Sequence, residues 1–124
     1  MKIIEKELSY KLIGVIYEVF NQIGGGHKEK MYQKAISIKL KEHQIKFEEQ
    51  VATPVKINDE QIGIYFLDFV VEDKIIIEIK QGKHFKISDF RQTKSYLSTT
   101  GHKLALLIVF TLEDVRFRRI LNLY

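Results

Sequence analysis

The segment from Leu104 to Thr111 is apolar at nearly every position, and it constrains the fold more than any other part of the chain. A strand with one face in water usually alternates apolar and polar residues, whereas a continuous apolar run is typical of a strand buried on both faces. The run is far too short to cross a bilayer, so we expect no membrane partner. We therefore expect an internal strand here, with both of its faces covered.

Three helices are expected from the spacing of apolar residues and from helix-end signals. The first ends at Gly24-Gly25-Gly26, and the second runs from about Lys28 to His43 with an apolar stripe that includes Met31. A third helix is expected to begin at Ser88, a suitable N-cap, and to stop at Gly101. These helices lie before and after a block of extended sequence.

The extended block predicts three antiparallel strands separated by short polar turns. The strands are expected at Ile45–Ile57, Gln61–Val71 and Ile75–Lys80. Val115–Leu121 is left open as a further edge strand or a helix. The resulting order is ααβββαβ, and 124 residues with 45% hydrophobic content predict a single domain over residues 1–124.

Charge and cysteine content narrow the possible settings of the chain. There are no cysteines, which excludes disulfides and thiolate metal sites and agrees with a cytoplasmic location. The net charge of +4 is matched by one window that holds five basic residues against one acid, Asp89. The five are Lys80, Lys83, Lys86, Arg91 and Lys94. A nucleic acid backbone would be attracted to this window, although a charge run alone is more often a solvated surface.

The hairpin that contains Asp68, Glu78 and Lys80 carries the candidate chemistry. Side chains alternate along a strand, so Glu78 and Lys80 share one face. Asp68 joins them only if Val71 pairs with Ile75 around a three-residue loop, or if a bulge lies near Asp68. The sequence therefore makes a geometric prediction that a structure can check.

Two carboxylates on opposed strands repel each other, so a positive group is expected between them. Carboxylate oxygens, with a backbone carbonyl such as that of Ile79, suit Mg²⁺ or Mn²⁺, and the four scattered histidines offer no zinc spacing. Lys80 could hold an attacking water or stabilise developing negative charge. The alternative is a salt bridge of Asp68, Glu78 and Lys80 that merely closes the hairpin.

Glu29 falls on the stripe of the second helix that contains Tyr32, Ile36 and Leu40, so its carboxylate is expected to point toward the core side. A carboxylate in the first turn is also favoured by the helix dipole, which offers a purely structural explanation.

The spacing of the hairpin residues resembles the PD-(D/E)XK nuclease superfamily, whose restriction-endonuclease-like core is a mixed sheet flanked by helices. More specific signals are Gly26-His27-Lys28-Glu29-Lys30-Met31-Tyr32, similar to the signature of the GxxExxY protein family, a branch of that superfamily, and Gln92 with Tyr96, similar to its Q-x-x-x-Y element. The likeness spans roughly Ser9 to Leu121.

This resemblance implies a role for each matching residue. Asp68, Glu78 and Glu29 would bind Mg²⁺ or Mn²⁺, Lys80 would serve the hydrolytic water, and Gln92 would orient substrate or metal-bound water. The expected nucleic-acid contacts are Lys83, Lys86, Arg91, Lys94 and Tyr96.

Three functions remain open at this point. The first is a metal-dependent nuclease acting on nucleic acid, with DNA as the expected class. The second is a non-catalytic module on the same fold that binds nucleic acid, a protein partner or another copy of itself. The third is a small-substrate hydrolase, such as a phosphatase, that uses the same carboxylates.

Overall fold

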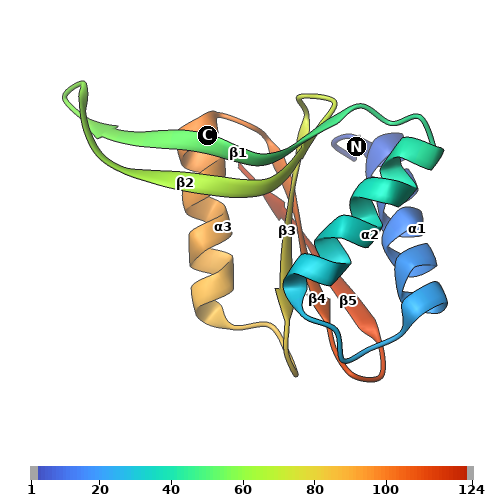
Figure 1. Ribbon diagram of the computed structural model, residues 1–124. Helices are drawn as coiled ribbons and strands as arrows, with labels where there is room; N and C mark the ends of the chain where they lie inside the picture. The colour runs from blue at the N-terminus through green and yellow to red at the C-terminus, as the bar shows by residue number, and fades with distance from the viewer. Residues whose placement is uncertain (1–2, 123–124) are drawn as a thin grey trace.

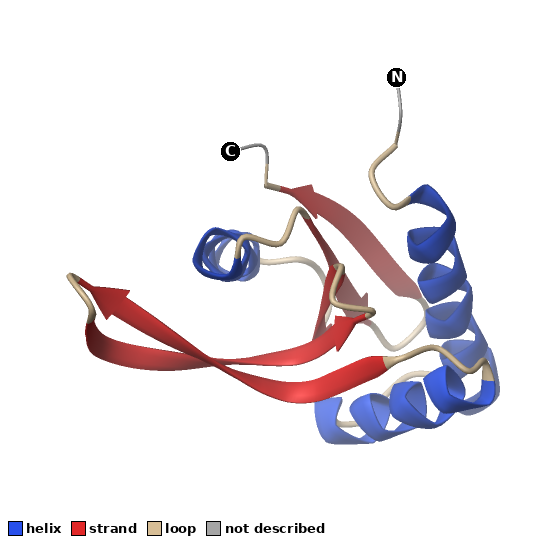
Figure 2. Ribbon diagram, turned by 90° about the horizontal axis from the view of Figure 1, so that it is seen from above, coloured by secondary structure: helices blue, strands red, loops and turns tan. Residues whose placement is uncertain are grey.

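A mixed sheet with helices on both faces forms the body of the protein (Figures 1 and 2). The computed structural model describes residues 3–122, so residues 1–2 and 123–124 of the expected domain lie outside the described part. The elements, in chain order, are α1 (Lys6–Ile23), α2 (Glu29–Glu42), β1 (Phe47–Ile57), β2 (Glu60–Val71), β3 (Ile75–Gln81), α3 (Ile87–Thr100), β4 (Leu104–Phe110) and β5 (Val115–Leu121). The expected ααβββαβ order is confirmed, and the open final segment is a strand.

Within residues 3–122 the five strands follow the spatial order β1-β2-β3-β4-β5. The β1/β2, β2/β3 and β4/β5 pairs are antiparallel, whereas β3 and β4 are parallel. A parallel pair needs a crossover connection, and α3 supplies it. The expected mixed sheet flanked by helices is therefore confirmed.

The strand β4 is buried at every position, as its apolar sequence predicts. Leu106 and Ile108 pack into a core that is shared with α1 and α2. Ala105 and Leu107 point the other way, into a second core under α3. Figure 2 shows the same layering, with α3 on one side of the sheet and the other two helices opposite. None of the helices among the described residues combines the length and the hydropathy needed to cross a bilayer.

The turn between α1 and α2 fixes where α2 begins. The Tyr32 hydroxyl donates a 2.7 Å hydrogen bond to the carbonyl oxygen of Gly24, and its ring stacks on Phe110 at 3.8 Å. Gly25 lies so close to the β4–β5 connection that an added Cβ would come within 2.2 Å of the Leu112 carbonyl oxygen. Gly24, Gly25 and Tyr32 thus hold the start of α2, and with it Glu29, in place.

Three sequence-based expectations are corrected. Ser88 does not cap α3, because the helix begins at Ile87 and the Asp89 carboxylate accepts the backbone N–H of its N-cap residue, Lys86, at 3.3 Å. Met31 is exposed, because α2 packs through Tyr32 and the residues one and two turns after it. The first strand begins at Phe47 instead of Ile45, which is buried in the loop before it.

The β1–β2 hairpin projects beyond the sheet as a two-stranded arm (Figure 1). β2 pairs with β3 only over Phe69–Val71, whereas its pairing with β1 continues to Glu60. One face of the arm rests on α3, where the Tyr65 and Tyr96 rings meet edge to face at 4.8 Å. The arm therefore leaves the sheet next to the predicted reactive residues.

Candidate active site

The β2–β3 hairpin has the geometry needed to bring Asp68 onto the face of Glu78. Val71 pairs with Ile75 and Phe69 with Ile77, so the loop contains the three residues 72–74. In this register the next facing residues are Asp68 and Glu78. The expected three-residue loop is confirmed.

Where Asp68 and Glu78 face each other, their carboxylates replace backbone carbonyls as the hydrogen-bond acceptors between the two strands. The backbone N–H of Asp68 donates to Glu78 Oε1 at 3.0 Å, and the backbone N–H of Ile79 donates to Asp68 Oδ2 at 2.8 Å. Each side chain therefore satisfies a backbone donor of the opposite strand, which fixes the carboxylates against the sheet.

The side-chain alternation of β2 reverses at Asp68. Leu67 packs into the core under α3, whereas Phe69 packs into the core under α1 and α2, although residues two apart normally share a face. Gln50 lies opposite Asp68, between the pairs Glu49–Phe69 and Val51–Leu67, and has a left-handed φ of 46°. The pairing register is the same on both sides of this position and shifts only between Val55 and Lys56, so the bulge near Asp68 considered as an alternative is absent and the three-residue loop alone sets the register.

Glu78 is the most strongly perturbed acid of the site. Its side chain is only 3% exposed, and burial, followed by the nearby charge of Asp68, raises its pKa to about 9. The charge of Lys80 opposes this shift and is the smallest contribution. An ionised Glu78 therefore needs more positive charge than Lys80 supplies, and a divalent cation between the carboxylates would provide it.

The helix α3 supplies Gln92 and Tyr96, which lie one turn apart. Gln92 Oε1 accepts a 3.1 Å hydrogen bond from Lys80 Nζ. Tyr96 is buried, and burial together with the charges of Glu78 and Asp68 raises its pKa. Tyr96 is only 5% exposed because its ring packs against Tyr65 of the arm, so it offers little surface for the expected nucleic-acid contact. Its place beside Glu78 fits a positioning role instead.

Glu29 lies at the edge of the site. The residue is exposed and does not enter the core, although it lies on the predicted stripe of α2. Partial burial nevertheless raises its pKa, the charge of Lys80 lowers it, and Asp68 and Asp89 raise it. Among residues 3–122 no three His, Asp or Glu side chains are grouped closely enough to hold a metal ion. Glu29 therefore interacts electrostatically with Lys80 and Asp68, but it does not form a three-residue metal-binding group with the two carboxylates.

Two glutamines of the site were missed from the sequence. Gln50 Nε2 donates to Gln33 Oε1 at 2.9 Å and to Asp68 Oδ1 at 3.3 Å. Gln33 follows Glu29 by four residues and shares its helix face, which is a signal the sequence contains. The role of Gln50 depends on its left-handed backbone, which the sequence does not reveal.

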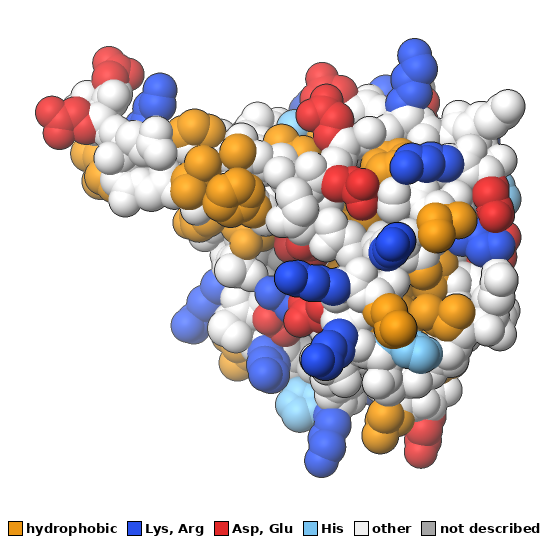
Figure 3. All heavy atoms as spheres, viewed as in Figure 1, with side chains coloured by type: hydrophobic (Ala, Val, Ile, Leu, Met, Phe, Trp, Pro, Cys, Tyr) orange, Lys and Arg blue, Asp and Glu red, His pale blue; other side chains and the backbone are white. Residues whose placement is uncertain are grey.

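Basic side chains surround the carboxylates. Lys83 and Lys86 lie in the exposed connection from β3 to α3, and Arg91 and Lys94 are exposed on that helix. On the other side, an open groove of about 730 Å³ is lined by Lys30, Lys34 and Lys41 of α2, together with Glu29, Gln33 and Gln50. Figure 3 shows blue side chains gathered around a few acidic ones below the arm.

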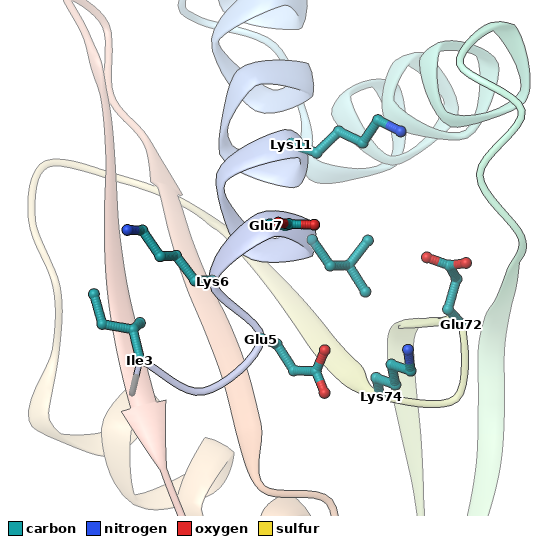
Figure 4. A pocket seen from close by; sticks show the side chains of 8 residues that line it. Ile3, Glu5, Lys6, Glu7, Lys11, Glu72 and Lys74 are labelled. Carbon is teal, nitrogen blue, oxygen red and sulfur yellow. The ribbon is translucent and has the colours of Figure 1, made fainter. Parts of the chain in front are cut away.

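A wider pocket of about 1040 Å³ lies at the other end of the β2–β3 hairpin (Figure 4). Glutamates and lysines of α1 and of the hairpin turn line it in comparable number, including Glu7, Lys11, Glu72 and Lys74. Its mixed charges offer no preference for an anionic or a cationic ligand. We therefore assign the chemistry to the carboxylate end of the hairpin.

The model of the PD-(D/E)XK nuclease superfamily matches residues 6–120, which includes every residue of this site. The chain belongs to this superfamily. Two solved structures share its fold. The crystal structure of SSO0001 is similar with a TM-score of 0.60 and 20% identity over 95% of this chain and 57% of that one. An alkaline exonuclease from Laribacter hongkongensis is similar with a TM-score of 0.56 and 14% identity over 98% and 72%, respectively.

None of the curated proteins compared with the chain matches it. The chain corresponds to little more than half the length of SSO0001, so these neighbours establish the core fold alone. The superfamily match supports a nuclease-like function for the site.

Proposed function

We propose that this protein hydrolyses phosphodiester bonds of nucleic acid, with DNA as the expected substrate, in a reaction that depends on Mg²⁺ or Mn²⁺. The observation that carries the proposal is the pair of opposed carboxylates, Asp68 and Glu78, fixed by hydrogen bonds across an opened hairpin with Lys80 beside them. Glu78 is buried, whereas Asp68 and Lys80 are partly exposed, so the arrangement opens to the surface between basic elements.

The donor set fits a hard divalent cation. Asp68 and Glu78 supply carboxylate oxygens, and burial together with the charge of Asp68 raises the pKa of Glu78, so a cation would favour its ionised form. When bound there, such an ion polarises a phosphoryl oxygen and lowers the pKa of a coordinated water.

The surrounding residues have separate roles in the proposed reaction. Lys80 Nζ, oriented by Gln92 at 3.1 Å, donates hydrogen bonds to the attacking water or to the developing negative charge. Gln50 and Gln33 hold the free oxygen of Asp68 in position. Glu29 adds negative potential from α2 and would support a cation held by Asp68 and Glu78. Lys83, Lys86, Arg91 and Lys94 attract the phosphate backbone.

The open shape of the site favours a polymer over a small substrate. The groove beside α2 continues away from Glu29 and Gln50 along the helix and carries lysines along its length. A mononucleotide phosphatase usually encloses most of its ligand, which this groove does not do. The Gly26, Glu29 and Tyr32 pattern also supports placement in the GxxExxY branch of the superfamily.

Cleavage assays with Mg²⁺ or Mn²⁺ on single- and double-stranded DNA and RNA test the proposal. We expect cleavage by the natural protein and a loss of roughly a thousandfold in Asp68→Ala and Glu78→Ala, since removing a metal ligand forfeits several kcal/mol of transition-state stabilisation. Glu113→Ala, an exposed acid in the β4–β5 connection, is the matched control and should cleave normally. Equal activity in Glu78→Ala and the control would refute the assignment and favour a non-catalytic module.

A further inference from the structure

The projecting arm carries an exposed apolar strip on the face that α3 does not cover. On β2, Tyr65 and Leu67 pack toward α3, so the alternate residues Ile64 and Phe66 point away from it. Ile64 is 44% exposed and Phe66 is 53% exposed. Figure 3 shows orange side chains gathered on the arm, above the blue side chains that lie around a few acidic ones.

The opposite strand extends the strip without adding charge. Phe66 pairs with Ala52, and Ile64 pairs with Pro54. Both β1 residues are exposed. The strip is therefore a small uncharged surface, two strands wide, on a protein whose remaining surface is rich in charge.

The strip leads directly to the carboxylates. Phe66 precedes Asp68 by two residues, which is about 7 Å along a strand. Because the alternation reverses at Asp68, Phe66 points to the face opposite α3, the side from which Gln33 and Gln50 reach Asp68. A polymer that runs along the groove beside α2 to Asp68 therefore passes beside Phe66. Such a polymer meets lysines of α2 and α3, Arg91 of α3, and apolar side chains on the arm. A single strand of nucleic acid offers these two chemistries side by side, as an anionic backbone and flat apolar bases.

From this juxtaposition we propose that the arm binds unpaired bases next to the scissile phosphate, with Phe66 as the stacking residue. The inference rests on the proposed function and narrows its substrate to single strands or to duplex ends with unpaired nucleotides. In an intact duplex the base faces are stacked on one another and cannot reach Phe66.

A second copy of the chain is the less favoured occupant of the strip. Ile64 and Phe66, with Ile62 further out on β2 at 62% exposed and the neighbouring alanine and proline, present on the order of 400 Å², given roughly 200 Å² for a large apolar side chain. A stable dimer interface needs about 800 Å² from each partner. The strip is thus large enough for one or two bases and too small to hold a dimer by itself.

Binding of a short oligonucleotide that carries 2-aminopurine, with Ca²⁺ replacing Mg²⁺ to prevent cleavage, tests this inference. We expect the single strand to bind with quenching of the probe, and Phe66→Ala to lose the quenching and roughly tenfold in affinity. The matched control is Leu112→Ala, which removes an apolar side chain that is 73% exposed in the β4–β5 connection, and it should behave like the natural protein.

The possible outcomes separate the two proposals. If the natural protein cleaves nucleic acid but Phe66→Ala binds and quenches normally, the arm inference is wrong and the proposed function stands. The inference is also overturned if Phe66→Ala loses as much affinity for a blunt duplex as for the single strand. It is likewise overturned if Phe66→Ala changes the protein from dimer to monomer in light scattering while oligonucleotide binding is unchanged. If the natural protein neither binds nor cleaves any nucleic acid, the proposed function fails and the arm inference fails with it.

Discussion

Glu78 Oε1 accepts the backbone N–H of Asp68 at 3.0 Å, and so occupies a position that a strand ladder would give to a backbone carbonyl. The reciprocal bond from Ile79 to Asp68 locks the second carboxylate in the same way. The two acids are held together by the backbone although their charges repel. In the metal-free protein Glu78 avoids this repulsion by keeping its proton, because its pKa is raised, and a bound cation would allow both acids to ionise.

The stability of the metal-free protein should fall as the pH rises from about 4.5 to about 9, because Glu78 keeps its proton to a higher pH in the fold than in the unfolded chain. Its contribution is complete below the unfolded pKa and is lost as the pH passes the folded pKa. The free energy of unfolding should decrease by at most ~1.4 kcal/mol per pH unit from this single group.

Urea unfolding at several pH values in EDTA measures this effect. Glu78→Gln, which cannot ionise, should show a flatter profile, and saturating Mg²⁺ should flatten the profile of the natural protein. Parallel profiles for the two proteins in EDTA would show that Glu78 does not titrate in this way.

Gln92→Ala should lower kcat by roughly tenfold to a hundredfold, because Lys80 Nζ loses the acceptor that holds it at 3.1 Å while the carboxylates stay in place. Mn²⁺ affinity by calorimetry should change little. Gln92→Glu, which keeps an acceptor oxygen, should recover part of the rate. Ser98→Ala, an exposed position on the same helix, is the control. A lost Mn²⁺ affinity with unchanged kcat would place Gln92 at the cation instead.

Gly25→Ala should destabilise the protein by about 2 kcal/mol or more, because the new Cβ would meet the Leu112 carbonyl oxygen at 2.2 Å and force the two backbones apart. Gly63→Ala on β2 is the matched control, since its added Cβ would have no atom within 4 Å. Thermal unfolding of both variants provides the comparison. Equal melting temperatures would mean that the α1–α2 turn can relax at little cost.

The sequence predicts the fold well because most helices and strands are marked by patterns of neighbouring residues. β4 is buried on both faces and has the continuous apolar run that this burial requires. The glycines after α1 end that helix, and the three-residue hairpin loop follows from the parity of Asp68 and Glu78. These features depend on neighbours in the chain, which a sequence displays.

The errors concern side chains whose environment is set by distant parts of the chain. Tyr96 matches a motif position, yet its burial depends on the arm folding back over α3. The exposure of Glu29 depends on where the turn before α2 places the first residue of that helix. Gln50 reaches Asp68 through a left-handed residue that no local pattern marks. The arm was predicted as strands, but its projection depends on how briefly β2 pairs with β3.

Crystals soaked in Mn²⁺ and measured at the manganese absorption edge test the central claim most directly. We predict an anomalous peak between the carboxylates of Asp68 and Glu78, and its disappearance in crystals of Glu78→Gln. A saturating soak that leaves this position without a peak, while the two carboxylates keep their places, would contradict a metal-dependent site at this hairpin.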